Sequence, residues 1–221
     1  EGGTGYNHCV TMGRSRNIWG PYEKDPNGPV VTSNPVETNE RNNIDHLKPQ
    51  YFNPYTTLQK AGHGSLVDLP NGESYLVHLC ARPFVPELRC TLGRETAIQK
   101  MKWTDEGWLR MTDGTNIAKE YTEESALEEY PVSQIPDFDD FDSDILGSWY
   151  YSPRIMPSCF ADINARKGYV RLRGQESRTS LNKVSILARK LTSTYATVTT
   201  KMEYIPEMPH QSAGLIFYYD N

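Results

Sequence analysis

Alternating hydrophobic and polar residues mark several short β-strands in the first half of the chain. Two such runs, over 65–69 and 75–79, flank the turn sequence Pro70-Asn71-Gly72-Glu73. Asn-Gly between β-rich runs is a strong signal for a tight hairpin. The same pattern predicts a second hairpin, with strands over 96–103 and 108–111 that are joined by a turn at 105–107. A third turn region, over 22–31, is rich in Pro and Gly.

The β pattern is interrupted once. Between 113 and 136, glutamates gather while glycines and aromatic residues thin out, which indicates an acidic linker with one helical turn at 125–129. After Pro136, period-2 alternation returns over 169–173, 195–202 and 213–219. Short alternating strands are typical of an antiparallel sandwich with one solvated face. We therefore expect two β regions joined by this linker.

Composition narrows the class of protein. The 221 residues carry a net charge of -5, and no stretch concentrates Lys and Arg as a nucleic-acid surface would. No apolar run approaches the ~18 residues of a membrane helix. The cysteines at 9, 80, 90 and 159 match no zinc-ligand spacing. We expect four free and mostly buried thiols, with Cys80 and Cys90 as the only plausible disulfide pair.

A cluster of aspartates follows the linker. Asp140-x-Asp142-x-Asp144 resembles the start of an EF-hand loop, which then needs Gly at its sixth place and Glu at its twelfth. Those places hold Ile145 and Tyr151, so the EF-hand interpretation fails. A solvated acidic strand start is preferred, and a calcium site of another kind is the alternative.

Two short motifs in the first half could carry chemistry. Gly62-His63-Gly64 places a histidine between two glycines, which allow the close approach of backbone or ligand. Arg94 follows Gly93 just before a predicted strand, where its guanidinium could present a planar fork to ligand oxygens. Each motif also has a purely structural interpretation: His63 as a turn residue, and Arg94 as half of a surface charge couple with Glu95.

Taken together, segments in both halves resemble one enzyme family. Nine segments occur in a characteristic order: 1–8 (EGGTGYNH), 15–22 (SRNIWGPY), 58–65 (LQKAGHGS), 75–79 (YLVHL), 92–100 (LGRETAIQK), 140–142, 153–154, 168–174 (GYVRLRG) and 211–215 (QSAGL). In these segments and their order, the chain strongly resembles the β-xylosidase/α-L-arabinofuranosidase branch of glycoside hydrolase family 43. The resemblance covers nearly the whole chain, apart from the loop at 32–58 and the linker.

The resemblance implies an all-β fold in which part of a five-bladed β-propeller precedes part of a β-sandwich. We assign 1–112 to the last propeller blades, 113–136 to the linker and 137–221 to the first part of the sandwich. The chain begins on a polar, Gly-rich segment and ends directly after an alternating run. We therefore expect a piece of a longer polypeptide.

The resemblance also implies an activity. The parent enzyme would hydrolyse terminal β-D-xylosyl or α-L-arabinofuranosyl residues in xylan degradation by an inverting mechanism, in which one carboxylic acid and one carboxylate act across the sugar. The catalytic carboxylates would lie upstream of Glu1, so no catalytic residue is assigned in this chain and the 221 residues alone would be inactive. The alternatives are a non-catalytic carbohydrate-binding β module and an assembly fragment.

Three residues are implied as ligands of the sugar pocket. Arg94 would bind substrate hydroxyls, Thr4 would line the pocket wall, and His63 would lie near the propeller axis. There His63 would contact a calcium ion or ordered water, with its flanking glycines clearing room around the imidazole. No cofactor is required for the chemistry itself.

The implied partners are a xylo-oligosaccharide or arabinoxylo-oligosaccharide substrate and the rest of the same polypeptide or a homo-oligomer, with no nucleic acid and no membrane. The free thiols favour a cytoplasmic location over a periplasmic one.

Overall fold

A computed structural model describes residues 5–34 and 52–219. The chain divides into two compact units, Glu1–Glu129 and Tyr130–Asn221, and each is described here by itself. Among the described residues, strands are the main regular elements of the first unit, most of the second unit has no regular secondary structure, and the one helical element is a 3-10 turn at Pro157–Cys159. Within these ranges no helix has the length and apolar character needed to cross a membrane.

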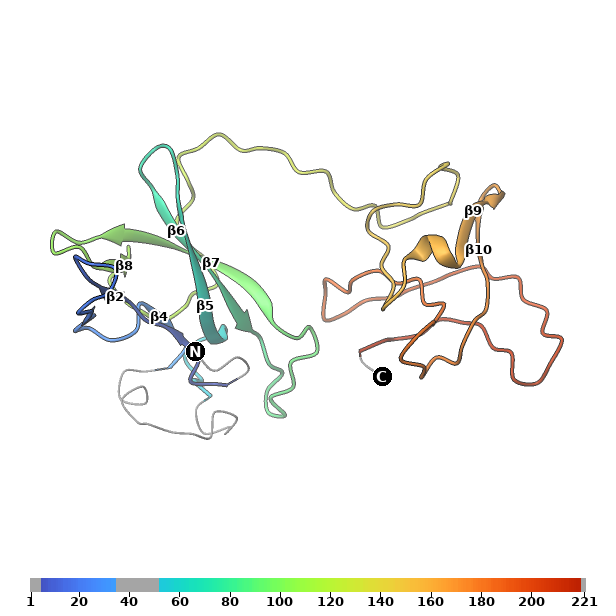
Figure 1. Ribbon diagram of the computed structural model, residues 1–221, viewed down its shortest axis with the longest axis horizontal. Coiled ribbons are helices and arrows are strands. Elements are labelled where there is room, and N and C mark those ends of the chain that lie inside the picture. The colour runs from blue at the N-terminus through green and yellow to red at the C-terminus, as the bar shows by residue number, and fades with distance from the viewer. Residues whose placement is uncertain (1–4, 35–51, 220–221) are drawn as a thin grey trace. The chain divides into compact units, whose positions relative to one another are not determined.

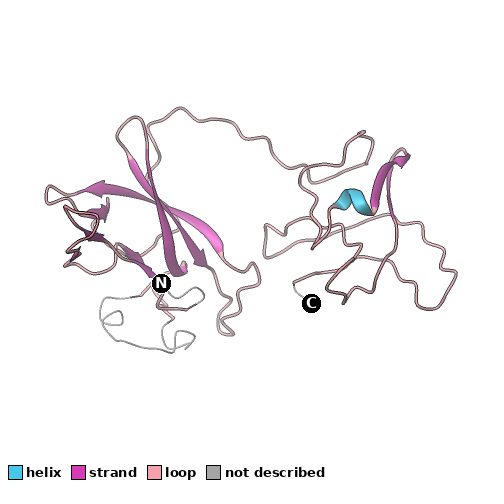
Figure 2. Cartoon of the chain, in the orientation of Figure 1, coloured by secondary structure: helices cyan, strands magenta, loops and turns pink. Residues whose placement is uncertain are grey.

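The first unit is built on a four-stranded antiparallel sheet (Figures 1 and 2). Its strands follow one another in chain order: β5 (Gln59–Asp68), β6 (Ser74–Ala81), β7 (Glu95–Trp103) and β8 (Leu109–Met111). Gly72 and Gly107 take the positive φ angles of 87° and 77° that the two predicted turns require. Both hairpins predicted from the sequence are therefore confirmed, and the meander has the four strands of a propeller blade.

Four two-residue strands precede this sheet. β1 (Cys9–Val10) pairs with β4 (Val31–Thr32), and β2 (Gly13–Arg14) pairs with β3 (Glu23–Lys24). The predicted turn region at 22–31 therefore connects short strands.

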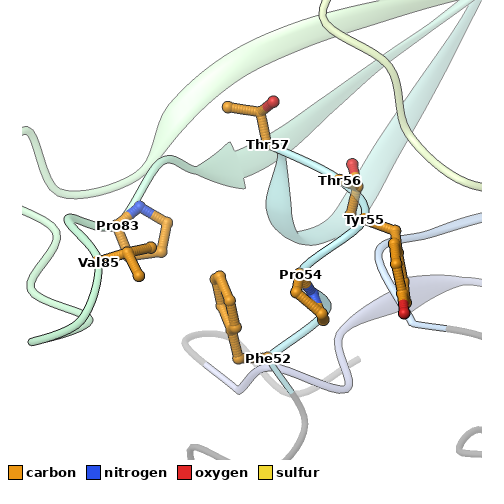
Figure 3. Close-up of a pocket in the computed structure, with 7 residues that line it drawn as sticks. All are labelled: Phe52, Pro54, Tyr55, Thr56, Thr57, Pro83 and Val85. Atoms are coloured by element: carbon orange, nitrogen blue, oxygen red, sulfur yellow. The ribbon is translucent and has the colours of Figure 1, made fainter.

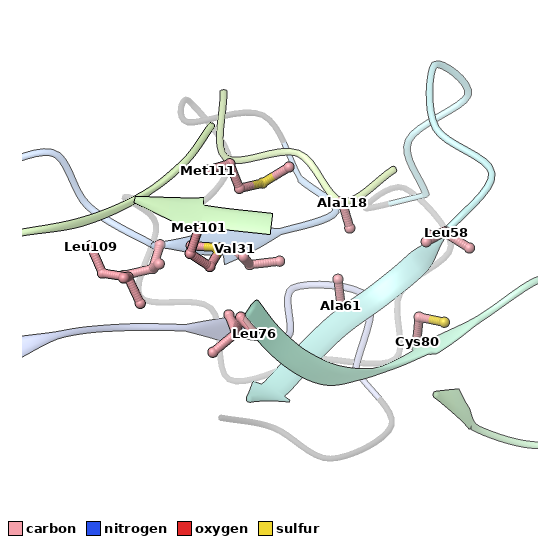
Figure 4. Packing of buried hydrophobic residues seen from close by; sticks show 10 residues of the cluster. Val31, Leu58, Ala61, Leu76, Cys80, Met101, Leu109, Met111 and Ala118 are labelled. Carbon is pink, nitrogen blue, oxygen red and sulfur yellow. The ribbon is translucent and has the colours of Figure 1, made fainter. Parts of the chain in front are cut away.

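One hydrophobic cluster holds the first unit together (Figure 4). Ala61, Leu76, Met101 and Leu109 from the sheet pack with Val31 from β4 and with residues before β5 and after β8. The cluster comprises Val30, Val31, Leu58, Ala61, Leu76, Cys80, Met101, Leu109, Met111 and Ala118.

Buried polar side chains fix the segment that leads into β5. The Gln59 amide donates to the carbonyls of Asn53 and Thr56 at 2.7 and 2.6 Å, and its Oε1 accepts from the Asn53 N–H at 3.0 Å. Ser33 Oγ donates to the Leu58 carbonyl at 2.6 Å and accepts from the Ala61 N–H at 2.9 Å. Because buried polar groups are costly when unpaired, this network ties the start of β5 to the segment after β4.

The first part of the predicted linker is attached to the sheet. Thr122 Oγ1 accepts a hydrogen bond from the backbone N–H of Lys100 at 2.8 Å, and the Lys119 carbonyl accepts one from Gln99 Nε2 at 2.9 Å. The expected helical turn at 125–129 is wrong, because these residues adopt no helical conformation.

The second unit contains one hairpin, β9 (Ala161–Arg166) with β10 (Tyr169–Leu172). The alternating run at 169–173 is therefore confirmed as a strand. The runs at 195–202 and 213–219 form no strand in the described part of the unit, which corrects the sequence prediction. Alternation marks an apolar face, but a strand also needs a neighbouring backbone as its hydrogen-bond partner. Without one, Tyr195 and Phe217 stay 85% and 72% exposed.

All four cysteines are free, as expected. Cys80 is buried, Cys9 and Cys90 are partly buried, and Cys159 is exposed, so the expectation of mostly buried thiols is only partly met.

Candidate active-site segment

His63 lies on β5 at an interruption of the ladder. Gln59 pairs with Ala81, Gly62 with Leu79, and Ser65 with Val77, so β5 twice advances three residues while β6 advances two. Each extra residue makes a β-bulge, and bulges gather where a strand re-aims side chains near functional sites. Lys60 and His63 have φ angles of 57° and 54°, the left-handed conformation that such bulges use. The His63 side chain is exposed.

The two glycines beside His63 also make room for side chains from other segments. A β-carbon on Gly62 would lie 2.5 Å from Cγ and Cδ2 of His8. A β-carbon on Gly64 would lie 2.9 Å from Val10 Cγ2 and 3.0 Å from Leu76 Cδ1. Both glycines therefore admit the segment around β1, which packs directly on β5.

Arg94 lies immediately before β7 and is exposed. Gly93, with a φ of 71°, makes the turn that leads into it. The neighbouring Glu95 pairs with Arg82, whose Nη2 lies 2.6 Å from Glu95 Oε1. Glu95 therefore forms its ion pair across the hairpin, with Arg82. From the sequence, Arg94 had been considered as the partner of Glu95.

His63 and Arg94 come to one region of the sheet because β5 and β7 both run antiparallel to β6. His8, which faces Gly62 in the same region, has a pKa that responds to several nearby groups. Burial lowers the pKa of His8, the hydrogen bond to the Lys60 carbonyl opposes this, and the positive charges of Arg94 and His63 lower the pKa further. Thr4, the third predicted pocket residue, lies outside the described residues.

His8 is the member of this region that sequence reasoning did not single out. It is 1% exposed, and its Nδ1 lies 3.2 Å from the Lys60 carbonyl oxygen. The signal was present in the sequence, because His8 closes the motif at residues 1–8 that carries the family resemblance. Only the fold shows that this residue contacts Gly62, 54 positions further along the chain.

Three shielded carboxylates in the described part of the first unit, those of Asp25, Glu73 and Glu95, are each paired with a cation. Asp25 accepts from both Nη atoms of Arg110, at 2.5 and 2.7 Å. Glu73 lies 2.7 Å from Lys100 Nζ, and Glu95 is held by Arg82. Lys100, with Ser125 and Asn71, lowers the pKa of Glu73 to about 2. The pKa of Asp25 is also lowered, by its hydrogen bonds from Arg110. A general acid of a glycosidase needs the opposite, a raised pKa, so neither Asp25 nor Glu73 suits that role.

The acidic run at 137–144 forms local turns. Asp139 and Asp140 each accept a hydrogen bond from the backbone N–H two residues on, at 2.8 and 3.1 Å. Across the described ranges, no group of three His, Cys, Asp or Glu side chains is arranged to hold a metal ion.

A shallow pocket of about 280 Å³ lies where β5 begins and β6 ends (Figure 3). Its lining is mostly apolar and includes three residues with hydroxyl groups: Phe52, Pro54, Tyr55, Thr56, Thr57, Pro83 and Val85. Figure 3 shows Phe52 directed toward Pro83 and Val85, while the Tyr55 ring points away from them.

Two family models match the sequence. The model of glycosyl hydrolases family 43 matches residues 1–109, and that of the β-xylosidase C-terminal concanavalin A-like domain matches residues 138–221.

Relatives with these two parts are similar over the whole chain. Xylosidase/arabinosidase 43B of Humicola insolens is 36% identical over 99% of this chain and 37% of its own length. A non-reducing end α-L-arabinofuranosidase of Bacteroides ovatus is 30% identical over all of this chain and 38% of its own length. The chain thus spans less than half the length of these curated relatives.

A solved structure is similar to this chain in both sequence and fold. The xylan β-1,4-xylosidase of Bacillus halodurans C-125 is 44% identical and superposes with a TM-score of 0.73, covering 87% of this chain and 34% of the other. The predicted fold class, part of a β-propeller followed by part of a β-sandwich, is confirmed.

Proposed function

The chain belongs to glycosyl hydrolase family 43, and on this premise we propose that it forms part of an enzyme that removes terminal β-D-xylosyl or α-L-arabinofuranosyl residues from xylo-oligosaccharides. The names of its relatives support this substrate class, because they include xylosidases and arabinofuranosidases. The activity would belong to a longer polypeptide, which also contains the parts of those relatives that this chain does not cover.

The placement of Arg94 and His63 carries the proposal. Both are exposed; His63 lies in the first half of β5 and Arg94 immediately before β7, and these two strands flank β6 and run in the same direction. A guanidinium donates several hydrogen bonds in one plane, which suits adjacent sugar hydroxyls. His63 would contribute an imidazole at the wall of the same sugar site, and Thr4 would line it.

Hydrolysis would follow the inverting route. A carboxylate takes a proton from water, the water oxygen attacks the anomeric carbon, and the glycosidic C–O bond breaks as a carboxylic acid protonates the leaving oxygen. The shielded carboxylates described in the first unit are already bound by Arg82, Lys100 and Arg110. We therefore place the acid and the base on the part of the polypeptide outside these 221 residues.

A calcium ion or an ordered water at the propeller axis would have His63 as its contact in this chain. The described residues do not by themselves fit a metal cage, because no three ligand side chains converge. No step of the mechanism is routed through such an ion.

The test is an assay of the full-length polypeptide on nitrophenyl β-D-xylopyranoside and nitrophenyl α-L-arabinofuranoside, with the β-D-glucopyranoside as control. We expect release of nitrophenol from the first, the second or both, and NMR should show α-xylose as the first product from the β-xyloside. Binding of xylobiose without hydrolysis would instead support the carbohydrate-binding module. Retention of the anomeric configuration would overturn the inverting mechanism.

A further inference from the structure

The backbone that presents His63 is held in an unusual form. Between Gln59 and Ser65, β5 contains both bulges and both non-glycine residues of the strand with positive φ, Lys60 and His63. The left-handed region is sterically unfavourable for a non-glycine residue, so this segment needs contacts that stabilise it.

His8 supplies such contacts from another part of the chain. Its Nδ1–H donates to the carbonyl of Lys60 at 3.2 Å, and Lys60 lies within the first bulge. The imidazole also faces Gly62, where a β-carbon would lie 2.5 Å from two ring atoms. One buried ring therefore contacts the residue on each side of Ala61 and borders the second bulge at His63.

The position of His8 is fixed in turn. Its N–H donates to the Gly5 carbonyl at 3.2 Å, and its own carbonyl accepts from Thr32 Oγ1 at 3.3 Å. The next residue, Cys9, pairs with Thr32 in the β1–β4 ladder. His8 is thus a rigid support, not a side chain that adapts to β5.

We propose that His8 is a positioning residue of the sugar site, whose buried imidazole holds the double bulge of β5 and thereby aims His63 relative to Arg94. The inference rests on the proposed role of His63 and Arg94 as sugar ligands. His8 itself would not touch the sugar, because it is buried beneath Gly62.

The first test follows the backbone and needs no substrate. Amide hydrogen exchange over 60–65 should be at least tenfold faster in His8→Leu than in the wild-type enzyme, because the bulge loses its support. His8→Asn, which keeps an N–H donor near the position of Nδ1, should restore part of the protection. Unchanged exchange in His8→Leu would overturn the positioning role, whatever the kinetics show.

The second test is kinetic, in the full-length enzyme on an aryl β-xyloside. His8→Leu should lower kcat/KM about 10- to 100-fold in the wild-type background, but less than about threefold when His63→Ala is already present, since His8 acts through His63. Leu109→Ala is the control: Leu109 is also buried in the core but lies on β8, which is separated from β5 by two strands. It should lower the melting temperature and leave kcat/KM within about threefold of the wild-type value.

The outcomes separate the two hypotheses. Equal losses from His8→Leu with and without His63→Ala would overturn the inference about His8. If His63→Ala and Arg94→Ala both leave kcat/KM unchanged while His8→Leu still speeds exchange over 60–65, His8 supports the bulge but the proposed sugar site is wrong.

Discussion

The imidazole of His8 occupies the space that a side chain on Gly62 would need. A β-carbon at 62 would lie 2.5 Å from two ring atoms of His8, closer than any ordinary van der Waals contact. Since His8 is anchored by Thr32 and Lys60, the ring cannot withdraw without breaking hydrogen bonds. The relationship explains why the sequence carries glycine here, although Gly62 has no positive φ angle.

Gly62→Ala is therefore expected to destabilise the first unit. Overpacking of a close-packed site typically costs about 1–3 kcal/mol, which urea unfolding can measure. The control is Gly174→Ala, because a β-carbon at Gly174 would meet nothing within 4 Å. It should change the free energy of unfolding by less than about 0.5 kcal/mol. Equal effects of the two substitutions would contradict the close contact.

Arg94→Ala in the full-length enzyme should lower kcat/KM on aryl β-xylosides about 10- to 100-fold and leave the fold intact. A hydrogen bond from a charged group is worth about 1.5–3 kcal/mol, and Arg94 is exposed, so its loss removes no core packing. Arg94→Lys should recover only part of the activity, because an ammonium cannot donate two parallel hydrogen bonds. An unchanged kcat/KM for Arg94→Ala would remove Arg94 from the site.

The first unit should lose stability as the pH falls below about 6.5, the ordinary pKa of histidine. Burial lowers the pKa of both His8 and His78 in the folded protein. A group with a lowered folded pKa contributes stability above its unfolded pKa, and that contribution is lost as pH falls toward the folded value. Each histidine adds a slope of at most about 1.4 kcal/mol per pH unit in this window.

His78→Asn separates the two histidines in that experiment. His78 Nδ1–H donates to the Leu79 carbonyl at 3.0 Å, and Nε2 accepts from Gln99 Nε2 at 3.2 Å, so the ring is held neutral. Asn keeps a donor near Nδ1 but does not titrate. In His78→Asn, the change in unfolding free energy per pH unit between pH 6.5 and 5.5 should therefore be smaller than in the wild-type protein. An unchanged slope would show that groups other than His78 cause the pH dependence. Glu73, with its pKa of about 2, loses its contribution in a separate window below pH 4.5.

The ion pair between Asp25 and Arg110 gives a further stability prediction. The Asp25 side chain is 1% exposed, and the two hydrogen bonds from Arg110 outweigh the effect of burial and lower its pKa. Asp25→Asn should cost about 3 kcal/mol, because it leaves the guanidinium without its anion. Glu23→Gln, which breaks the exposed pair with Arg14, should cost less than about 1 kcal/mol in the same denaturation experiment. Equal costs would show that burial adds nothing to the Asp25 pair.

The parts of the fold that are specified locally could be predicted from the sequence. Asn71-Gly72 and Asp105-Glu106-Gly107 determine their turns through residues that are adjacent in the chain, and both hairpins form where the pattern placed them. The bulges of β5 could not be predicted in this way. They depend on His8 and Ser33, which contact Lys60 and Ala61 only after the chain has folded.

In the second unit, the sequence pattern predicted strands that the described residues do not form. Its alternating runs near Val198 and Leu215 have the composition of strands, yet no described backbone pairs with them and both side chains are more than 60% exposed. Pairing is a property of two segments, so one segment's pattern cannot decide it. The site residues differ again: the identities of His63 and Arg94 came from the family resemblance, and their proximity came from the antiparallel order of β5, β6 and β7.

Residues 1–221 expressed alone should show no turnover of aryl β-xylosides or aryl α-L-arabinofuranosides. The inverting mechanism needs an acid and a base on opposite faces of the sugar, and general acid–base help alone contributes about 10²–10⁴-fold. In the described part of the first unit, Asp25, Glu73 and Glu95 are each bound to a cation, so no shielded carboxylate remains for either role. The full-length polypeptide is the positive control, assayed at equal molar concentration with both chains shown to be folded by circular dichroism. Turnover by residues 1–221 comparable to that control would show that the catalytic carboxylates lie within this chain, and Glu1, Asp68 and Glu95 would be the first to substitute.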